Sequence, residues 1–217
     1  MPIFFQQQIN DTTRMGIWKI EETEDFFLGS VPLHRDVTHP HKRLQHLAGR
    51  YLLQFLFPAF PYELIKIADT RKPFLPDEQY HFSISHCGDY AAAIVSKRSR
   101  VGIDIEIPTE KVEKIKDKFL NAEEMTELAT GNWPPVADAM TRETPNGNHQ
   151  LVTVLWSAKE AVFKWYGNGG VDFSDHIRLQ KKNNGEHTMD CFFEKTKTPL
   201  IIHYKLFNHL VLAWVVN

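Results

Sequence analysis

Apolar residues recur every three or four positions through residues 45–57, beginning with Leu47, Ala48 and Leu52. This spacing matches the period of an α-helix, so the segment predicts an amphipathic helix. Pro58 marks its end, because proline cannot continue a helix.

Two-residue alternation follows in residues 80–85 and predicts a half-buried strand. Gly88 and Asp89 form a turn that leads into residues 90–95, so these two segments predict a β-hairpin. A further short strand is predicted at residues 101–107.

The second half of the chain has a similar pattern. A helix is predicted at residues 154–166, ended by Gly167, and a hairpin at residues 200–207 and 210–216. We therefore predict an α+β fold of two similar, pseudo-symmetric lobes, each a small antiparallel sheet packed on a long helix, with a ligand cleft between them.

The expected boundary between the lobes lies near residue 108, which gives an N-terminal lobe of residues 1–108 and a C-terminal lobe of residues 109–217. Polar and turn-forming residues dominate the insert at residues 131–150, which includes two neighbouring prolines. This composition predicts a mobile loop.

Composition narrows the class of protein. With 217 residues, 42% of them hydrophobic, the chain is long enough to bury a core without disulfides or metal staples. The formal charge of -2 argues against a nucleic-acid binder that neutralises many phosphates. Two cysteines and no apolar run of about 20 residues favour a cytoplasmic protein that is not inserted in a membrane.

Two carboxylates stand two residues apart in the strand predicted at residues 101–107. Asp104 and Glu106 therefore share one face, while Ile103 and Ile105 share the other. Like charges held together are costly, and a hard divalent cation is the simplest way to neutralise them. The alternative is an exposed acidic edge that discourages strand pairing.

Glu160 and Lys164 stand four residues apart in the helix predicted at residues 154–166, so an acid and an ammonium group reach the same place. Two structural explanations remain open. Ser157 and Glu160 have the spacing of a capping box, and Glu160 with Lys164 has the spacing of an ordinary surface ion pair.

A hydroxyl and an imidazole end the strand before Gly88. Ser85 and His86 could both donate hydrogen bonds to a phosphate there. A Cys87–His86 nucleophile is disfavoured, because neighbouring side chains on a strand diverge. His86 could equally be a turn residue, since the chain has 11 histidines.

Together these motifs resemble the signature of the 4'-phosphopantetheinyl transferases. The residues that carry the resemblance are Gly102-Ile103-Asp104-Ile105-Glu106 and, later, Trp156-Ser157-Ala158-Lys159-Glu160-Ala161 with Lys164. Weaker matches are Lys42-Arg43, His46 to Arg50, Lys72-Pro73, Ser83 to Cys87, and Phe119 to Asn121 with Glu124. The resemblance covers Lys42 to Gly167 and fits the two-lobed, monomeric type.

The resemblance implies an enzyme that transfers phosphopantetheine from coenzyme A to a serine of an acyl or peptidyl carrier protein. It implies a Mg2+ site, which could also accept Mn2+, at Asp104, Glu106 and Glu160. It makes His86 and Lys164 pyrophosphate ligands and, with Glu160, catalytic residues. The residues it suggests for the nucleotide end of coenzyme A are Arg43, Arg50, Lys72 and Ser85.

The chemistry leaves two rival functions. One is a magnesium-dependent nucleotide phosphohydrolase, and the other is a catalytically dead relative that binds carrier proteins. A stripe of Lys111, Lys114 and Lys118 on the helix predicted after Pro108 could steer an acidic carrier. The same stripe could be a solvated face balanced by nearby acids.

Overall fold

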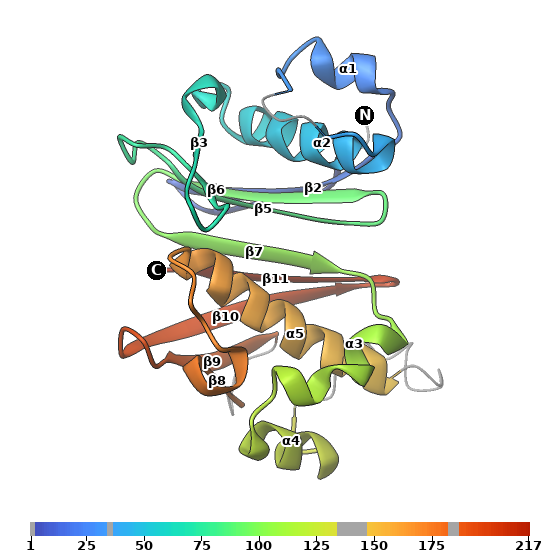
Figure 1. Cartoon of the computed structure of the whole chain (residues 1–217), viewed down its shortest axis with the longest axis vertical. Helices are drawn as coiled ribbons and strands as arrows, with labels where there is room; N and C mark the ends of the chain where they lie inside the picture. The colour runs from blue at the N-terminus through green and yellow to red at the C-terminus, as the bar shows by residue number, and fades with distance from the viewer. Residues whose placement is uncertain (1–2, 34–36, 134–146, 182–186) are drawn as a thin grey trace.

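The computed structural model describes residues 3–33, 37–133, 147–181 and 187–217, and Figure 1 shows a mixed α+β fold. The predicted α+β class with antiparallel sheets is confirmed. The first sheet has the order β1-β2-β6-β5, and the second has the order β7-β11-β10-β9-β8. A short ribbon pairs β3 with β4.

The first sheet contains β1 (Ile3–Asn10), β2 (Thr13–Lys19), β5 (His81–Cys87) and β6 (Tyr90–Ser96), and the ribbon contains β3 (Lys66–Ile67) and β4 (Pro73–Phe74). The second sheet contains β7 (Val101–Glu106), β8 (Ile177–Lys181), β9 (Thr188–Phe193), β10 (Thr198–Phe207) and β11 (Leu210–Val216). The helices are α1 (Glu24–Leu28), α2 (Pro40–Leu56), α3 (Glu110–Lys114), α4 (Ala122–Ala129), α5 (Gly147–Tyr166) and α6 (Phe173–His176), with 3₁₀ turns η1 (Tyr62–Leu64) and η2 (Lys116–Lys118).

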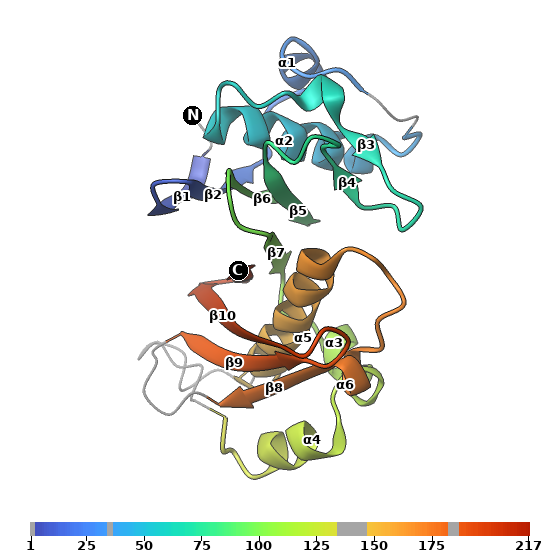
Figure 2. The ribbon, with the colours of Figure 1, turned by 90° about the vertical axis from the view of Figure 1, so that its left-hand side faces the viewer.

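The two sheets face each other across a central core. Met15 and Ile94 of the first sheet pack there with Ile103, Ile105 and Leu212 of the second. The opposite faces of the sheets are covered by helices, α2 on the first and α5 on the second (Figures 1 and 2). This arrangement explains the alternation in β7, whose isoleucines enter the central core while Asp104 faces α5.

Strand β7 lies within the predicted N-terminal lobe of residues 1–108, yet it belongs to the second sheet, whose other strands all follow residue 108. The strand is hydrogen-bonded to β11, where Asp104 lies opposite Ala213 and Glu106 opposite Val211. Sequence alternation shows which faces of a strand are buried, but it does not name the partner strand. The two sheets also differ in strand number and order, so the pseudo-symmetric lobes and their boundary at residue 108 remain predictions.

Both predicted hairpins are confirmed, as β5 with β6 and as β10 with β11. The predicted helices are longer than expected: α2 begins at Pro40 and α5 at Gly147. Residues 147–150 are therefore helical and do not belong to a loop, while residues 134–146 of that predicted loop lie outside the described part of the chain. Among the described helices, none is long and apolar enough to cross a bilayer.

The absence of a side chain at Gly102 lets α5 lie directly on β7. A Cβ atom at this position would lie 2.0 Å from the carbonyl oxygen of Ala161 and 2.7 Å from the backbone nitrogen of Trp165. Those contacts are with backbone atoms, which cannot rotate away. Gly102 thus sets the distance between the strand of Asp104 and the helix of Glu160.

Gly102→Ala is expected to destabilise the protein by about 3 kcal/mol, because the helix must move off the strand to admit the methyl group. Urea unfolding measures this change. Gly29→Ala is the matched control, because its φ is -65° and its Cβ would meet nothing closer than 3.6 Å. Equal stability of the two variants would contradict the close contact between α5 and β7.

Candidate functional site

Three elements bring a hydroxyl, a carboxylate and an ammonium group into mutual contact. Lys164 of α5 donates from Nζ to Oδ1 of Asp104 on β7 at 2.6 Å and to Oγ of Ser85 on β5 at 2.9 Å. The Ser85 hydroxyl donates to the same Asp104 oxygen at 2.8 Å. Asp104 is only 2% exposed, so this triangle is built into the contact between the two sheets and α5.

Glu106 and Glu160 join Asp104 to form a carboxylate cluster. Burial raises the pKa of Glu160 to about 7; the nearby Lys164 opposes this shift, while the charges of Asp104 and Glu106 add to it. Burial also raises the pKa of Glu106, with the Asp104 charge the next cause. The three carboxylates therefore lie close enough to repel one another. This agrees with the prediction that Asp104 and Glu106 share one face of their strand.

The donor set of this cluster suits a hard cation, because it consists of carboxylate oxygens. Oδ2 of Asp104 is buried and has no hydrogen-bond partner among the described residues. In the described part of the chain, however, no three His, Cys, Asp or Glu side chains converge closely enough to hold a metal ion in this conformation. Lys164 provides the countercharge to Asp104 in this arrangement.

The raised pKa of Glu160 predicts a pH-dependent stability. The folded protein keeps the Glu160 proton up to about pH 7, whereas the unfolded chain loses it near the ordinary pKa of 4.5. The unfolded state therefore binds fewer protons between these values, and this group makes stability fall as pH rises through that window. Relative to Glu160→Gln, the wild type should lose about 1 to 2 kcal/mol between pH 5 and pH 7.5.

Urea unfolding with chelator present measures this difference, because a bound cation would itself stabilise the ionised cluster. The comparison with Glu160→Gln cancels the titration of the other groups. Parallel stability curves for the two proteins would show that Glu160 ionises normally in the folded state.

A cavity of about 710 Å³ lies next to the triangle and is lined by α2, β3, β4 and β5; we call it the α2 cavity. Its basic and imidazole groups come from His46, Arg50, Arg71 and His86. Arg50 is 6% exposed, and its Nη1 contacts Nδ1 of His46 at 3.1 Å. Arg71 was not among the residues predicted from the sequence, although it directly precedes the Lys72-Pro73 step.

His86 lines this cavity at the end of β5, next to Ser85 in the chain. Desolvation lowers its pKa, and the positive charge of Lys164 acts in the same direction. The imidazole is therefore held toward its neutral form, which can still donate one hydrogen bond. His86, Ser85 and Lys164 thus lie in one neighbourhood.

Arg43 and Lys72 lie elsewhere. Arg43 donates from Nη2 to Oε2 of Glu24 at 2.7 Å and does not line the α2 cavity. Lys72 lines two other cavities, and its Nζ lies 3.4 Å from the carbonyl oxygen of Trp165. The roles predicted for both residues at the nucleotide end remain predictions.

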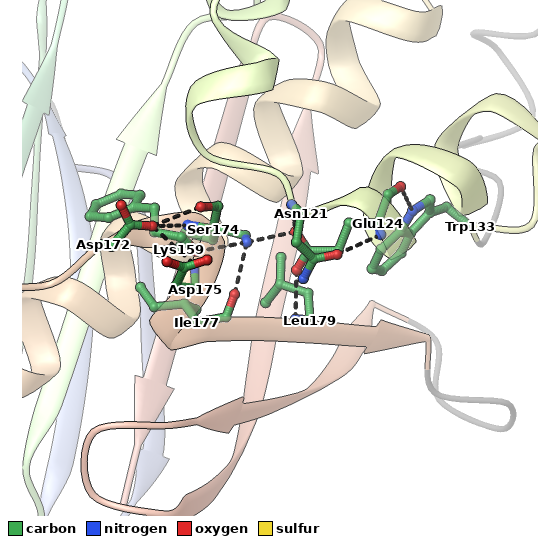
Figure 3. A network of polar contacts seen from close by, with 10 residues as sticks. Asn121, Glu124, Trp133, Lys159, Asp172, Ser174, Asp175, Ile177 and Leu179 are labelled. Carbon is green, nitrogen blue, oxygen red and sulfur yellow. Dashed lines mark hydrogen bonds and ion pairs between the residues drawn. The ribbon is translucent and has the colours of Figure 1, made fainter.

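A second polar centre, shown in Figure 3, fixes α5 from its other side. Lys159 has no exposed surface, and its Nζ donates to Oε2 of Glu124 at 2.7 Å and to the carbonyl oxygens of Phe173 and Ile177. Glu124 also accepts from the backbone nitrogens of Asn121 and Leu179. This network connects α4, α5 and β8. No role was predicted for Lys159 from the sequence.

Comparison with known proteins decides the family. The sequence model of the 4'-phosphopantetheinyl transferase superfamily matches residues 100–215, which include both β7 and α5. The chain belongs to this superfamily. The match confirms the resemblance to the family. The matched residues include the whole carboxylate cluster and Lys164.

Curated relatives of this superfamily member agree with that assignment. Enterobactin synthase component D of Salmonella austin is 32% identical over 141 residues, which cover 64% of this chain and 50% of the relative. The protein of the same name from Escherichia coli O157:H7 is 32% identical over 124 residues, or 57% of this chain and 54% of the relative. The 4'-phosphopantetheinyl transferase AcpT of Escherichia coli O157:H7 is 28% identical over 145 residues, or 64% and 68%. The matches thus span about half the length of the enterobactin synthase relatives.

Proposed function

We propose that the protein transfers the 4'-phosphopantetheine arm of coenzyme A to a serine of an acyl or peptidyl carrier protein and releases 3',5'-ADP. The observation that carries this proposal is the triangle of Ser85, Asp104 and Lys164 next to the basic α2 cavity. Membership of the superfamily and the similarity to a protein named 4'-phosphopantetheinyl transferase support it.

In the proposed reaction, the serine oxygen of the carrier attacks the phosphorus that bears pantetheine. The bond from that phosphorus to the oxygen of 3',5'-ADP breaks, and the serine proton leaves with a base. Glu160 suits the base role because its pKa of about 7 lies near the working pH. Lys164 suits the stabilisation of negative charge on the departing pyrophosphate oxygen, and His86 suits a hydrogen bond to the same group.

We also propose Asp104, Glu106 and Glu160 as the residues that would hold Mg2+ or Mn2+. The bound ion would supply positive charge against the pyrophosphate. Support comes from the carboxylate chemistry of the cluster and from the unpartnered Oδ2 of Asp104. Arg50, His46 and Arg71 are the groups of the α2 cavity that suit the phosphates and base of the nucleotide.

The helix that carries the lysine stripe is shorter than predicted. Helix α3 ends at Lys114, and Lys116–Lys118 forms the 3₁₀ turn η2, so the prediction that one helix carries all three lysines of the stripe is wrong. Val112 and Phe119 are nevertheless buried, while Lys111, Lys114 and Lys118 are exposed. We propose that this basic face attracts an acidic carrier protein. We also propose that the enzyme is a monomer and that it acts in the cytoplasm.

The decisive experiment incubates the protein with coenzyme A, Mg2+ and several apo carrier proteins, and follows the carriers by intact mass spectrometry. We expect a carrier to gain one phosphopantetheine group, and we expect chelator to stop the gain. A carrier whose attachment serine is replaced by alanine is the control. Cleavage of coenzyme A without a mass gain on any carrier would instead support the phosphohydrolase, and no reaction would support the dead relative.

A further inference from the structure

The C-terminal end of α5 lies next to the start of β7 (Figure 1). A separate cavity of about 280 Å³ is lined by residues of both, and we call it the α5-end cavity. Its walls include the aromatic rings of Phe74, Tyr80, Trp165 and Tyr166. It shares Pro73 alone with the α2 cavity, so it is a different site from the basic cavity proposed for the nucleotide.

The α5-end cavity brings two cationic side chains together. Lys72 and Arg100 both line it, and among the described residues neither forms an ion pair with a carboxylate. Burial, followed by the charge of Arg100, lowers the pKa of Lys72 to about 8. The two groups therefore repel each other in a partly desolvated place, which an anion between them would relieve.

One residue of the cavity wall has a buried donor without an acceptor. Trp165 is 6% exposed, and its indole N–H has no acceptor among the described residues. Burial lowers the pKa of His81, so this neighbouring imidazole is held toward its neutral form, which has one donor and one acceptor nitrogen. Glu78, the carboxylate of the lining, is exposed.

We propose that the α5-end cavity binds a small organic anion, a carboxylate carried on a flat apolar body. The carboxylate would accept hydrogen bonds from Arg100 and Lys72, because a guanidinium group matches a carboxylate in a bidentate manner. The apolar body would pack against the aromatic rings of Trp165 and Phe74. Inorganic anions could meet the charges but would leave those rings uncovered.

The α5-end cavity shares lining residues with a cavity that borders the proposed reaction centre. Lys72 and Gly167 also line a third cavity of about 220 Å³, whose lining includes Lys164. An occupant of the α5-end cavity therefore touches side chains that border the proposed phosphate site. The proposal itself does not depend on the transferase activity, because the cavity and its charges exist without coenzyme A.

Benzoate is a suitable probe, and benzamide is its uncharged control of nearly the same shape. The readout is the indole N–H signal of Trp165 in a proton–nitrogen correlation spectrum of the full chain, assigned with Trp165→Phe. We expect benzoate to shift this signal in a saturable way at millimolar concentrations. Benzamide should bind at least tenfold more weakly, as should inorganic phosphate.

Arg100→Gln should weaken benzoate binding about tenfold or more, because one of the two cations is lost. The matched control is Arg98→Gln, since Arg98 is exposed, stands two residues away and lines none of the three cavities described above. The proposal is overturned if benzoate leaves the Trp165 signal unchanged, if benzamide binds equally well, or if both arginine variants bind like the wild type.

Discussion

Asp104→Ala is expected to slow phosphopantetheine transfer by on the order of a thousandfold while the protein stays folded. Asp104 holds both the Lys164 ammonium group and the Ser85 hydroxyl through one oxygen and presents its second oxygen without a partner. Alanine removes all three functions at once. Transfer to an apo carrier, measured by mass spectrometry at saturating coenzyme A, gives the rate.

The thermal midpoint of Asp104→Ala should stay close to that of the wild type. The lost ion pair with Lys164 is offset because Glu160 and Glu106 lose a like-charged neighbour. Asp11→Ala is the control, since Asp11 is exposed in the turn between β1 and β2. Transfer within tenfold of the wild-type rate would remove Asp104 from the proposed site, whatever the family.

Lys159→Met is expected to lower the free energy of unfolding by about 3 to 5 kcal/mol, because it leaves the Glu124 carboxylate buried without its cation. Glu124 is 1% exposed and cannot reach water to compensate. Adding Glu124→Gln should restore part of the loss, because the neutral amide no longer needs a countercharge. Urea unfolding of both variants measures the effect.

The control for this experiment is an exposed ion pair of the same kind. Lys114 and Glu110 lie 3.3 Å apart with side chains 75% and 72% exposed, so Lys114→Met should cost less than about 1 kcal/mol. If Lys159→Met changed stability by as little as Lys114→Met, the buried network would not hold α5 in place.

The proximity of the cluster carboxylates and Lys164 was largely predictable because β7 and α5 are regular. Strand alternation placed Asp104 and Glu106 on one face, and helical spacing placed Glu160 near Lys164, without any knowledge of the partner strand. The partner of β7 was not predictable, since a strand buried on both faces fits either sheet. Lys159 was missed for a related reason: a lysine is rarely fully buried, and its partner Glu124 is distant in the sequence.

The cavities were beyond prediction from one sequence, because their walls come from segments brought together by tertiary packing. The family resemblance suggested both Arg43 and Arg50, which share a face of α2, as nucleotide ligands. The structure distinguishes them through Glu24, which engages Arg43 from helix α1. The spacing of residues along α2 cannot predict this ion pair, because Glu24 belongs to another helix.

Residues 97–100 connect β6 to β7 and so join two segments that contribute different parts of the candidate site. The residues named for the α2 cavity all precede this connection, whereas the carboxylate cluster and Lys164 all follow it. Recombination at this point would give the same acidic centre a different cavity. Exchange of the first segment would therefore change the cavity that we propose for the nucleotide and keep the carboxylate cluster, provided that the incoming segment kept a counterpart of Ser85.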